Sequence, residues 1–125
     1  MEIKTKLYVV NSAGEKFMGI GVLWLLKEIE KQGSLLSAAK ELGISYSKAY
    51  AMIQKLEKEL SVDVIERKKG GAEHIGSSLT PFGENFLILY DSFQNSAKDL
   101  LLSPFIQFSD KVENLIEEFG SNEKE

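Results

Sequence analysis

The sequence predicts a mainly α-helical fold with small β-hairpins: a winged helix-turn-helix followed by C-terminal dimerisation helices. Three observations support this prediction. Residues 33–60 contain two segments of helical apolar periodicity separated by one glycine. Residues 64–80 contain two short strand-like segments around a basic, glycine-containing turn. Residues 81–119 repeat bulky apolar side chains at helical spacing.

The same pattern divides the chain into three parts. Residues 1–80 are expected to form an N-terminal hairpin and the winged helix-turn-helix. Residues 81–119 are expected to form the C-terminal helices, and residues 120–125 a disordered tail.

The first thirty residues predict a hairpin followed by a helix. Residues 3–10 are rich in β-formers, residues 11–14 have turn chemistry, and residues 15–18 can return as a second strand. Residues 19–31 have helical periodicity, and Trp24 lies off the apolar stripe, so we expect it to pack against the hairpin or a partner chain. The stripe consists of Val22, Leu25, Leu26 and Ile29.

The first helix of the helix-turn-helix is predicted over residues 35–42. Ser34 is a good N-cap, and the small Ala38 and Ala39 in the middle allow a second helix to cross at close range. Gly43 stands where the helix must end, and glycine adopts the left-handed conformation without a Cβ penalty.

The second helix, predicted over residues 45–60, is the candidate DNA-recognition helix, and Ser45 can cap it. Its buried stripe is expected to contain Ala49, Met52, Ile53, Leu56 and Leu60. Its other face is polar, aromatic and basic, with Tyr46, Ser47, Lys48, Tyr50, Ala51, Gln54 and Lys55. An ordinary antiparallel helix pair is the alternative interpretation, and the segment that follows favours DNA binding.

That segment predicts a wing. Residues 64–67 form one strand candidate and residues 77–80 the returning one. Between them, cations and open glycine backbone suit contact with phosphates or the minor groove; these residues are Arg67, Lys68, Lys69, Gly70 and Gly71. A solvated basic loop is the alternative, which the preceding helix-turn-helix disfavours.

Both prolines follow a hydroxyl residue, as at the start of a helix. Thr80-Pro81 and Ser103-Pro104 therefore predict two helices, residues 81–102 and 104–119. Their apolar stripes are long for one small domain, so we expect them to pair with a symmetry mate. The residues expected at this dimer interface are Phe86, Tyr90, Phe93, Ala97, Leu100, Phe105 and Phe108. A purely intramolecular helical hairpin is the alternative, and the second helix could also swap across the dimer.

Composition agrees with one small domain of 125 residues without cysteine, hence without disulfides or a cysteine-based zinc site. The net charge is −4, but residues 45–71 carry six cations against four anions, a net of +2. Residues 104–125 carry two cations against six anions, a net of −4. The local charge therefore still suits a nucleic-acid partner.

Other function classes find little support. No signal-peptide or transmembrane pattern is present, so a cytoplasmic location without membrane association is expected. His74, the sole histidine, lies in the wing, and no phosphate-binding glycine motif or metal-ligand spacing occurs. We therefore expect no enzyme activity, no catalytic residues, no metal site and no cofactor.

Residues 17–90 resemble the N-terminal winged-helix domain of molybdate-responsive regulators of the ModE type, which is related to the LysR-type helix-turn-helix. The resemblance lies in Gly33-Ser34-Leu35, Ala38-Ala39-Lys40, Gly43-Ile44-Ser45-Tyr46, Glu66-Arg67, Gly70-Gly71 and Leu79-Thr80-Pro81-Phe82-Gly83. It implies a dimer that binds operator DNA and regulates transcription. Residues 72–75 interrupt the longer glycine run of the family's wing. Because the chain ends at Glu125, molybdate binding is not expected from this chain alone.

The sequence thus predicts a homodimeric, sequence-specific regulator of transcription that binds double-stranded DNA, or alternatively a winged-helix protein-interaction module. The expected DNA-binding residues are Ser34, Ser45, Tyr46, Ser47, Lys48, Tyr50, Gln54, Lys55, Arg67, Lys68, Lys69, Gly70 and Gly71.

Overall fold

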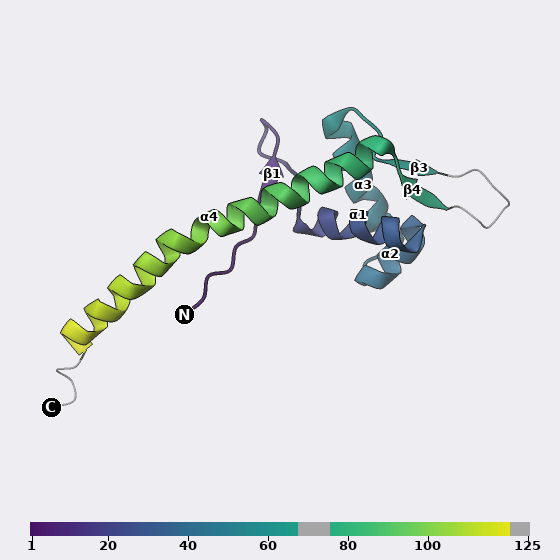
Figure 1. The fold of residues 1–125 in the computed structure, drawn as a ribbon. Coiled ribbons are helices and arrows are strands. Elements are labelled where there is room, and N and C mark those ends of the chain that lie inside the picture. The colour runs from purple at the N-terminus through teal and green to yellow at the C-terminus, as the bar shows by residue number, and fades with distance from the viewer. Residues whose placement is uncertain (68–75, 121–125) are drawn as a thin grey trace. The chain divides into compact units, whose positions relative to one another are not determined.

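A computed structural model describes residues 1–67 and 76–120 of the chain (Figure 1). Its compact units are Lys6–Asp91 and a second unit formed by Met1–Thr5 with Ser92–Glu125. The elements, in chain order, are β1 (Tyr8–Val10), β2 (Lys16–Gly19), α1 (Ile20–Gln32), α2 (Leu35–Leu42), α3 (Tyr46–Leu60), β3 (Ile65–Arg67), β4 (Ser77–Leu79) and α4 (Pro81–Gly120).

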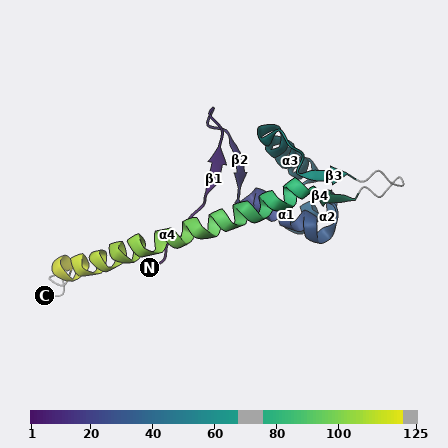
Figure 2. The same ribbon diagram turned by 45° about the horizontal axis from the view of Figure 1, so that its top comes forward.

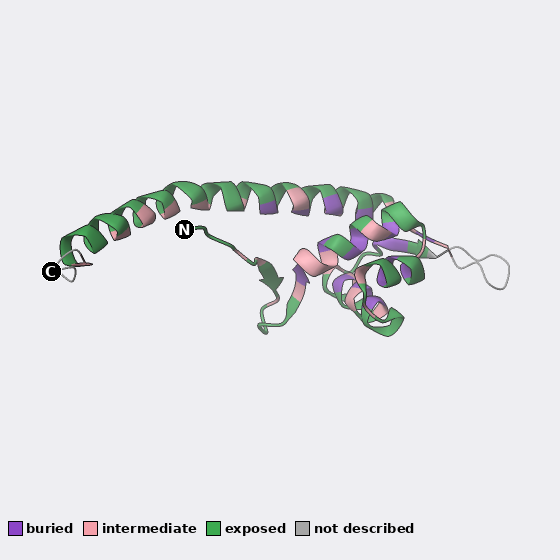
Figure 3. Ribbon diagram, turned by 90° about the horizontal axis from the view of Figure 1, so that it is seen from below, coloured by how far each residue is buried: buried purple, intermediate pink, exposed green. Residues whose placement is uncertain are grey.

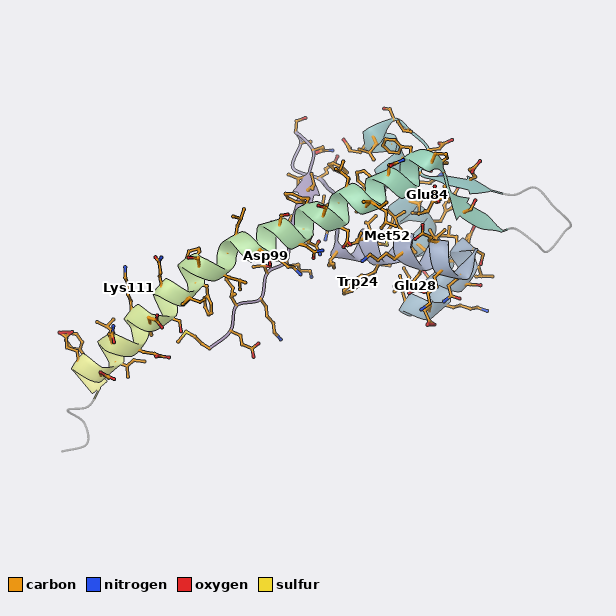
Figure 4. The ribbon with its side chains drawn as sticks, in the orientation of Figure 1. Trp24, Glu28, Met52, Glu84, Asp99 and Lys111 are labelled. Carbon is orange, nitrogen blue, oxygen red and sulfur yellow. The ribbon has the colours of Figure 1, made fainter. Side chains whose placement is uncertain are left out.

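The core of the Lys6–Asp91 unit lies between α1, α2, α3 and the root of the wing. The predicted α1 stripe is largely correct, but Leu23 is also buried and Val22 only partly so. The reason is that α1 packs against α2, α3, β2 and β4, which enclose more than one of its faces. Trp24, labelled in Figure 4, is 53% exposed, so the hairpin does not bury it.

Two separate antiparallel hairpins lie in this unit (Figure 2). In the first, Tyr8 pairs with Gly19 and Val9 with Met18. The prediction of a strand from residue 3 was wrong, because β1 begins at Tyr8. Beyond Gly19 the chain enters α1, so residues before Tyr8 have no strand opposite them.

The C-terminal region differs from the two predicted helices. α4 is one helix of 40 residues with Pro104 inside it, so the predicted end at residue 102 and new start at Pro104 were wrong. Proline removes one backbone donor and strains the turn before it. A break would instead leave several amides and carbonyls of two new helix ends without partners. A helix that continues through Pro104 therefore leaves fewer backbone amides and carbonyls without hydrogen-bond partners than two separate helices would.

Burial along α4 changes with position (Figure 3). Gly83, Leu87, Tyr90 and Gln94 are buried, whereas every described residue after Gln94 is partly or fully exposed. The predicted tail, residues 121–125, lies outside the described residues. In the described part of the chain, no helix combines the length and apolarity needed to cross a bilayer.

Candidate nucleic-acid interface

The turn between α2 and α3 follows directly from local side-chain chemistry. The Ser34 hydroxyl accepts a hydrogen bond from the Ser37 amide at 3.0 Å and caps α2. Gly43 ends α2 at φ 71° in the left-handed region, and the Ile44 amide donates to the Ala39 carbonyl at 3.0 Å. These contacts confirm the predicted N-cap and glycine turn.

The close crossing of α2 and α3 and a second N-cap hold α3 in place. Ala38 and Ala39 are fully buried, as expected where two helices cross at short range. The Ser45 hydroxyl accepts from the Lys48 amide at 3.1 Å and caps α3. Ser34 and Ser45 therefore serve the structure at the two helix starts.

The inner face of α3 anchors it in the core. Ala49, Ile53 and Leu56 are buried, whereas Met52 and Leu60 are only partly buried, so the core stripe is narrower than predicted. Met52 lies to one side because it faces the cavity beside the hairpin.

The outer face of α3 carries small and polar residues. Ser47, Ala51, Gln54 and Lys58 are exposed and follow one another at helical spacing. Toward the wing, the Tyr46 and Tyr50 rings stack with centroids 6.1 Å apart and planes at 19°. The Gln54 amide donates to the Tyr50 hydroxyl at 3.0 Å. This hydrogen bond restrains Gln54 at the edge of the exposed face.

Two cations stand on the other flank of α3. Lys48 and Lys55 are exposed and lie two turns apart, on the side toward the β1–β2 hairpin. Among the described residues the ion pair formed is Lys27 with Asp91, at 3.2 Å, so neither lysine is neutralised by a described carboxylate. Both ammonium groups can therefore contact an external anion.

Glu57, which sequence reasoning missed, joins α3 to the wing. Its carboxylate accepts from the Val64 amide at 2.8 Å and from the Ile65 amide at 3.3 Å. In the sequence Glu57 resembles any other charge on a helix, and only the path of the chain after Leu60 shows its role. Its contacts fix where the wing leaves α3.

The structure describes the two strands at the base of the wing, β3 and β4. The predicted pairing of two strands at the wing is confirmed: β3 and β4 are antiparallel, with Ile65 opposite Leu79 and Arg67 opposite Ser77. The Ser77 amide donates to the Gly33 carbonyl at 2.9 Å and ties β4 to the start of the helix-turn-helix. The predicted contacts Lys68, Lys69, Gly70 and Gly71 lie outside the described residues, as does His74.

The residues predicted at the dimer interface differ in how far they are buried along α4. Tyr90 is buried at 6% exposure, and its hydroxyl lies 3.4 Å from the Leu7 carbonyl. Burial raises the pKa of the Tyr90 hydroxyl, which stays protonated near neutral pH. Phe93, Leu100 and Phe108 are exposed. Phe86, Ala97 and Phe105 are partly buried.

One family model matches the chain over residues 22–84, which include α2, the turn, α3 and the wing. Its description is "Bacterial regulatory helix-turn-helix protein, lysR family". The match therefore contains every element of the candidate interface.

Curated relatives resemble the same region. The molybdenum-pterin-binding protein MopB of Rhodobacter capsulatus is 34% identical over 86 residues, 69% of this chain and 32% of that protein. The DNA-binding transcriptional dual regulator ModE of Escherichia coli K12 is 36% identical over 80 residues, 62% of this chain and 30% of that protein. The resemblance to ModE-type regulators is thus confirmed. The matched part spans about a third of the length of these relatives.

Solved structures show the same fold. The DNA-binding domain of CbnR in complex with DNA has 26% identity and a TM-score of 0.51, covering 69% of this chain and 99% of that chain. The DNA-binding domain of BenM with benA site 1 DNA has 25% identity and a TM-score of 0.53, covering 74% and 97%. The predicted winged helix-turn-helix is confirmed.

Proposed function

Because the chain belongs to the lysR family of bacterial regulatory helix-turn-helix proteins, we propose that it is a dimeric, sequence-specific DNA-binding regulator of transcription. The exposed face of a firmly anchored α3 is the observation that carries this proposal. The names of ModE and of the CbnR and BenM complexes support it, since each refers to DNA. A DNA-binding role would also place the protein in the cytoplasm.

In this proposal α3 enters the major groove. Ser47 and Ala51 are small, so the helix can approach base edges closely along its centre. Tyr46, Tyr50 and Gln54 then reach bases on the wing side. Lys48 and Lys55 reach phosphates on the opposite side, and the wing lies along the neighbouring backbone.

A second copy of the chain would double this interface. In a two-fold dimer the two α3 helices would read half-sites about 34–36 Å apart, or a multiple of that distance. The operator would then be an imperfect palindrome.

The test is selection from a randomised duplex DNA pool by the purified protein at two salt concentrations. We expect enrichment of one palindromic motif and weaker binding as salt rises. No enriched motif, with only weak salt-sensitive binding, would contradict the proposal and favour a protein-interaction module.

Replacement of Gln54 by alanine should relax base preference at one position of the operator. A side-chain amide can pair with adenine through two hydrogen bonds, which contribute about 1–3 kcal/mol of discrimination. The measurement is a base-by-base scan of the selected operator with both proteins. An unchanged scan would remove Gln54 from the base-reading set, and Gln107→Ala at an exposed position on α4 provides a matched variant outside α3.

Replacement of Lys48 by alanine should weaken binding to all sequences alike. Loss of one phosphate contact lowers the slope of log affinity against log salt concentration by about 0.9. Binding isotherms at four or more salt concentrations measure that slope. Lys98→Ala on α4 removes the same charge outside the helix-turn-helix and should leave the slope unchanged. Equal slopes for wild type and Lys48→Ala would exclude this phosphate contact.

A further inference from the structure

A cavity of about 290 Å³ lies where the β1–β2 hairpin meets the start of α1 and the flank of α3. Its wall is mainly apolar, with contributions from Phe17, Met18, Ile20, Val22 and Met52. Met52, labelled in Figure 4, comes from α3, and Met18 from β2. The volume lies just below the range of about 300–1,000 Å³ that is typical of small-molecule sites, so the ligand must be small.

The polar part of the wall carries charge of one sign. Lys6 and Lys16 come from the hairpin segment, Lys48 and Lys55 come from α3, and no acidic residue of the described part of the chain lines the cavity. Within the described residues none of these four lysines forms an ion pair. Like charges around one cavity repel, so an anion bound among them is favoured.

Nearby carboxylates are engaged elsewhere. Glu59 lies one turn after Lys55 on α3, yet its carboxylate accepts from the Asn11 side-chain amide at 3.0 and 3.1 Å. Glu15 of the hairpin also accepts from Asn11, at 3.0 Å. Both carboxylates are therefore held at the hairpin turn, and neither forms an ion pair with a cavity lysine among the described residues.

The start of α1 adds to the positive character of the cavity. Residues 19–22 line the wall, the first turn of α1 has no acidic side chain, and Gly19 provides no side-chain cap. The amides at a helix start carry partial positive charge.

We propose that this cavity binds a small amphipathic anion, a carboxylate or sulfonate with a compact apolar body. The apolar wall would enclose the body, and the lysines would hold the charged group. A DNA phosphate fits less well, because it has no apolar part to occupy the wall. The consequence for DNA rests on the proposed function: an anion held by Lys48 and Lys55 would compete with phosphates and lower DNA affinity.

The probe for binding is the fluorescent sulfonate 8-anilinonaphthalene-1-sulfonate. The double variant Lys6→Ala/Lys16→Ala should weaken its binding roughly tenfold, because two cations near the sulfonate are lost. The matched double variant Lys31→Ala/Lys98→Ala removes the same charge outside the cavity and should bind like wild type. Equal affinity in all three proteins would overturn the proposal.

A cavity-filling variant tests the apolar wall independently. A Cβ on Gly21 would lie 3.9 Å from the Met52 Cε, so the side chain in Gly21→Leu extends toward the cavity without a close contact at its first atom. We expect it to reduce probe binding, and circular dichroism checks that every variant is folded. Undiminished binding to folded Gly21→Leu would overturn the site.

Displacement of the probe distinguishes a charged ligand from an uncharged one, and competition with DNA tests the regulatory consequence. Octanoate should displace the probe, whereas octanol, which has the same apolar body without the charge, should displace it far less; equal displacement would overturn the lysine role. Octanoate should also lower affinity for the selected operator in wild type but not in Gly21→Leu. Probe binding without competition would overturn the regulatory step. A failed DNA selection would overturn the proposed function and leave the probe-binding result intact.

Discussion

Replacement of Gly83 by alanine is expected to destabilise the protein by about 1–3 kcal/mol or more, as overpacking of a buried position does. Gly83 is buried in the first turn of α4. A Cβ there would overlap the Val64 carbonyl oxygen and lie 3.0 Å from its carbon. The neighbour is backbone, which cannot move aside as a flexible side chain can.

The same carbonyl holds the joint between the wing and α4, which explains why the backbone cannot shift without further loss. The Thr80 amide donates to the Val64 carbonyl at 3.0 Å, and the Thr80 hydroxyl donates to the Asp63 carbonyl at 2.8 Å. The Gly83 amide donates in turn to the Thr80 hydroxyl at 2.9 Å. Movement of Val64 would disturb this connected set of hydrogen bonds.

Urea denaturation of wild type and Gly83→Ala measures the effect. The matched control is Gly21→Ala, also in the first turn of a helix, where the added Cβ meets nothing closer than 3.9 Å. Alanine is the better helix former, so this control should be neutral or stabilising by up to about 1 kcal/mol. If the two variants had the same stability, the close approach at Gly83 would not matter.

The features predicted correctly from the sequence depend on local chemistry. Ser34, Gly43 and Ser45 identify their helix ends because a cap or a left-handed turn needs only a few neighbouring residues. The two strands of the wing were also predictable, because β-forming residues flank a glycine-containing turn. These local signals are sufficient to predict the helix-turn-helix and the order of its elements from the sequence.

The features that were missed depend on distant parts of the chain. Helical spacing puts Tyr90 and Phe93 on one broad apolar stripe, and only the tertiary packing shows that one is buried and the other exposed. Glu57 becomes a wing contact only because residues 64 and 65 return to it. Pro104 is a different case, because its local sequence is that of a helix start and yet the helix continues through it.

Replacement of Phe93 and Leu100 together by glutamate should abolish the proposed dimer and lower operator affinity by about 10²–10⁴-fold, the usual gain from two linked sites. The exposed stripe of α4 consists of Phe82, Leu89, Phe93 and Leu100, at intervals of seven, four and seven residues. This spacing is typical of helices that pair along their length. Leu89 is 70% exposed and Leu100 77%, so the stripe is largely accessible to a second copy.

The matched control is Asn95→Glu, which adds the same charge at an exposed position on another face of α4. Sedimentation should show a monomer for the double variant and a dimer for wild type and Asn95→Glu. The monomer should retain weak binding to an isolated half-site, because α3 is unchanged, and lose the advantage of the complete palindrome. A double variant that remains dimeric would exclude this stripe as the interface. A monomer that bound the complete operator like wild type would instead show that dimerisation is not needed for recognition.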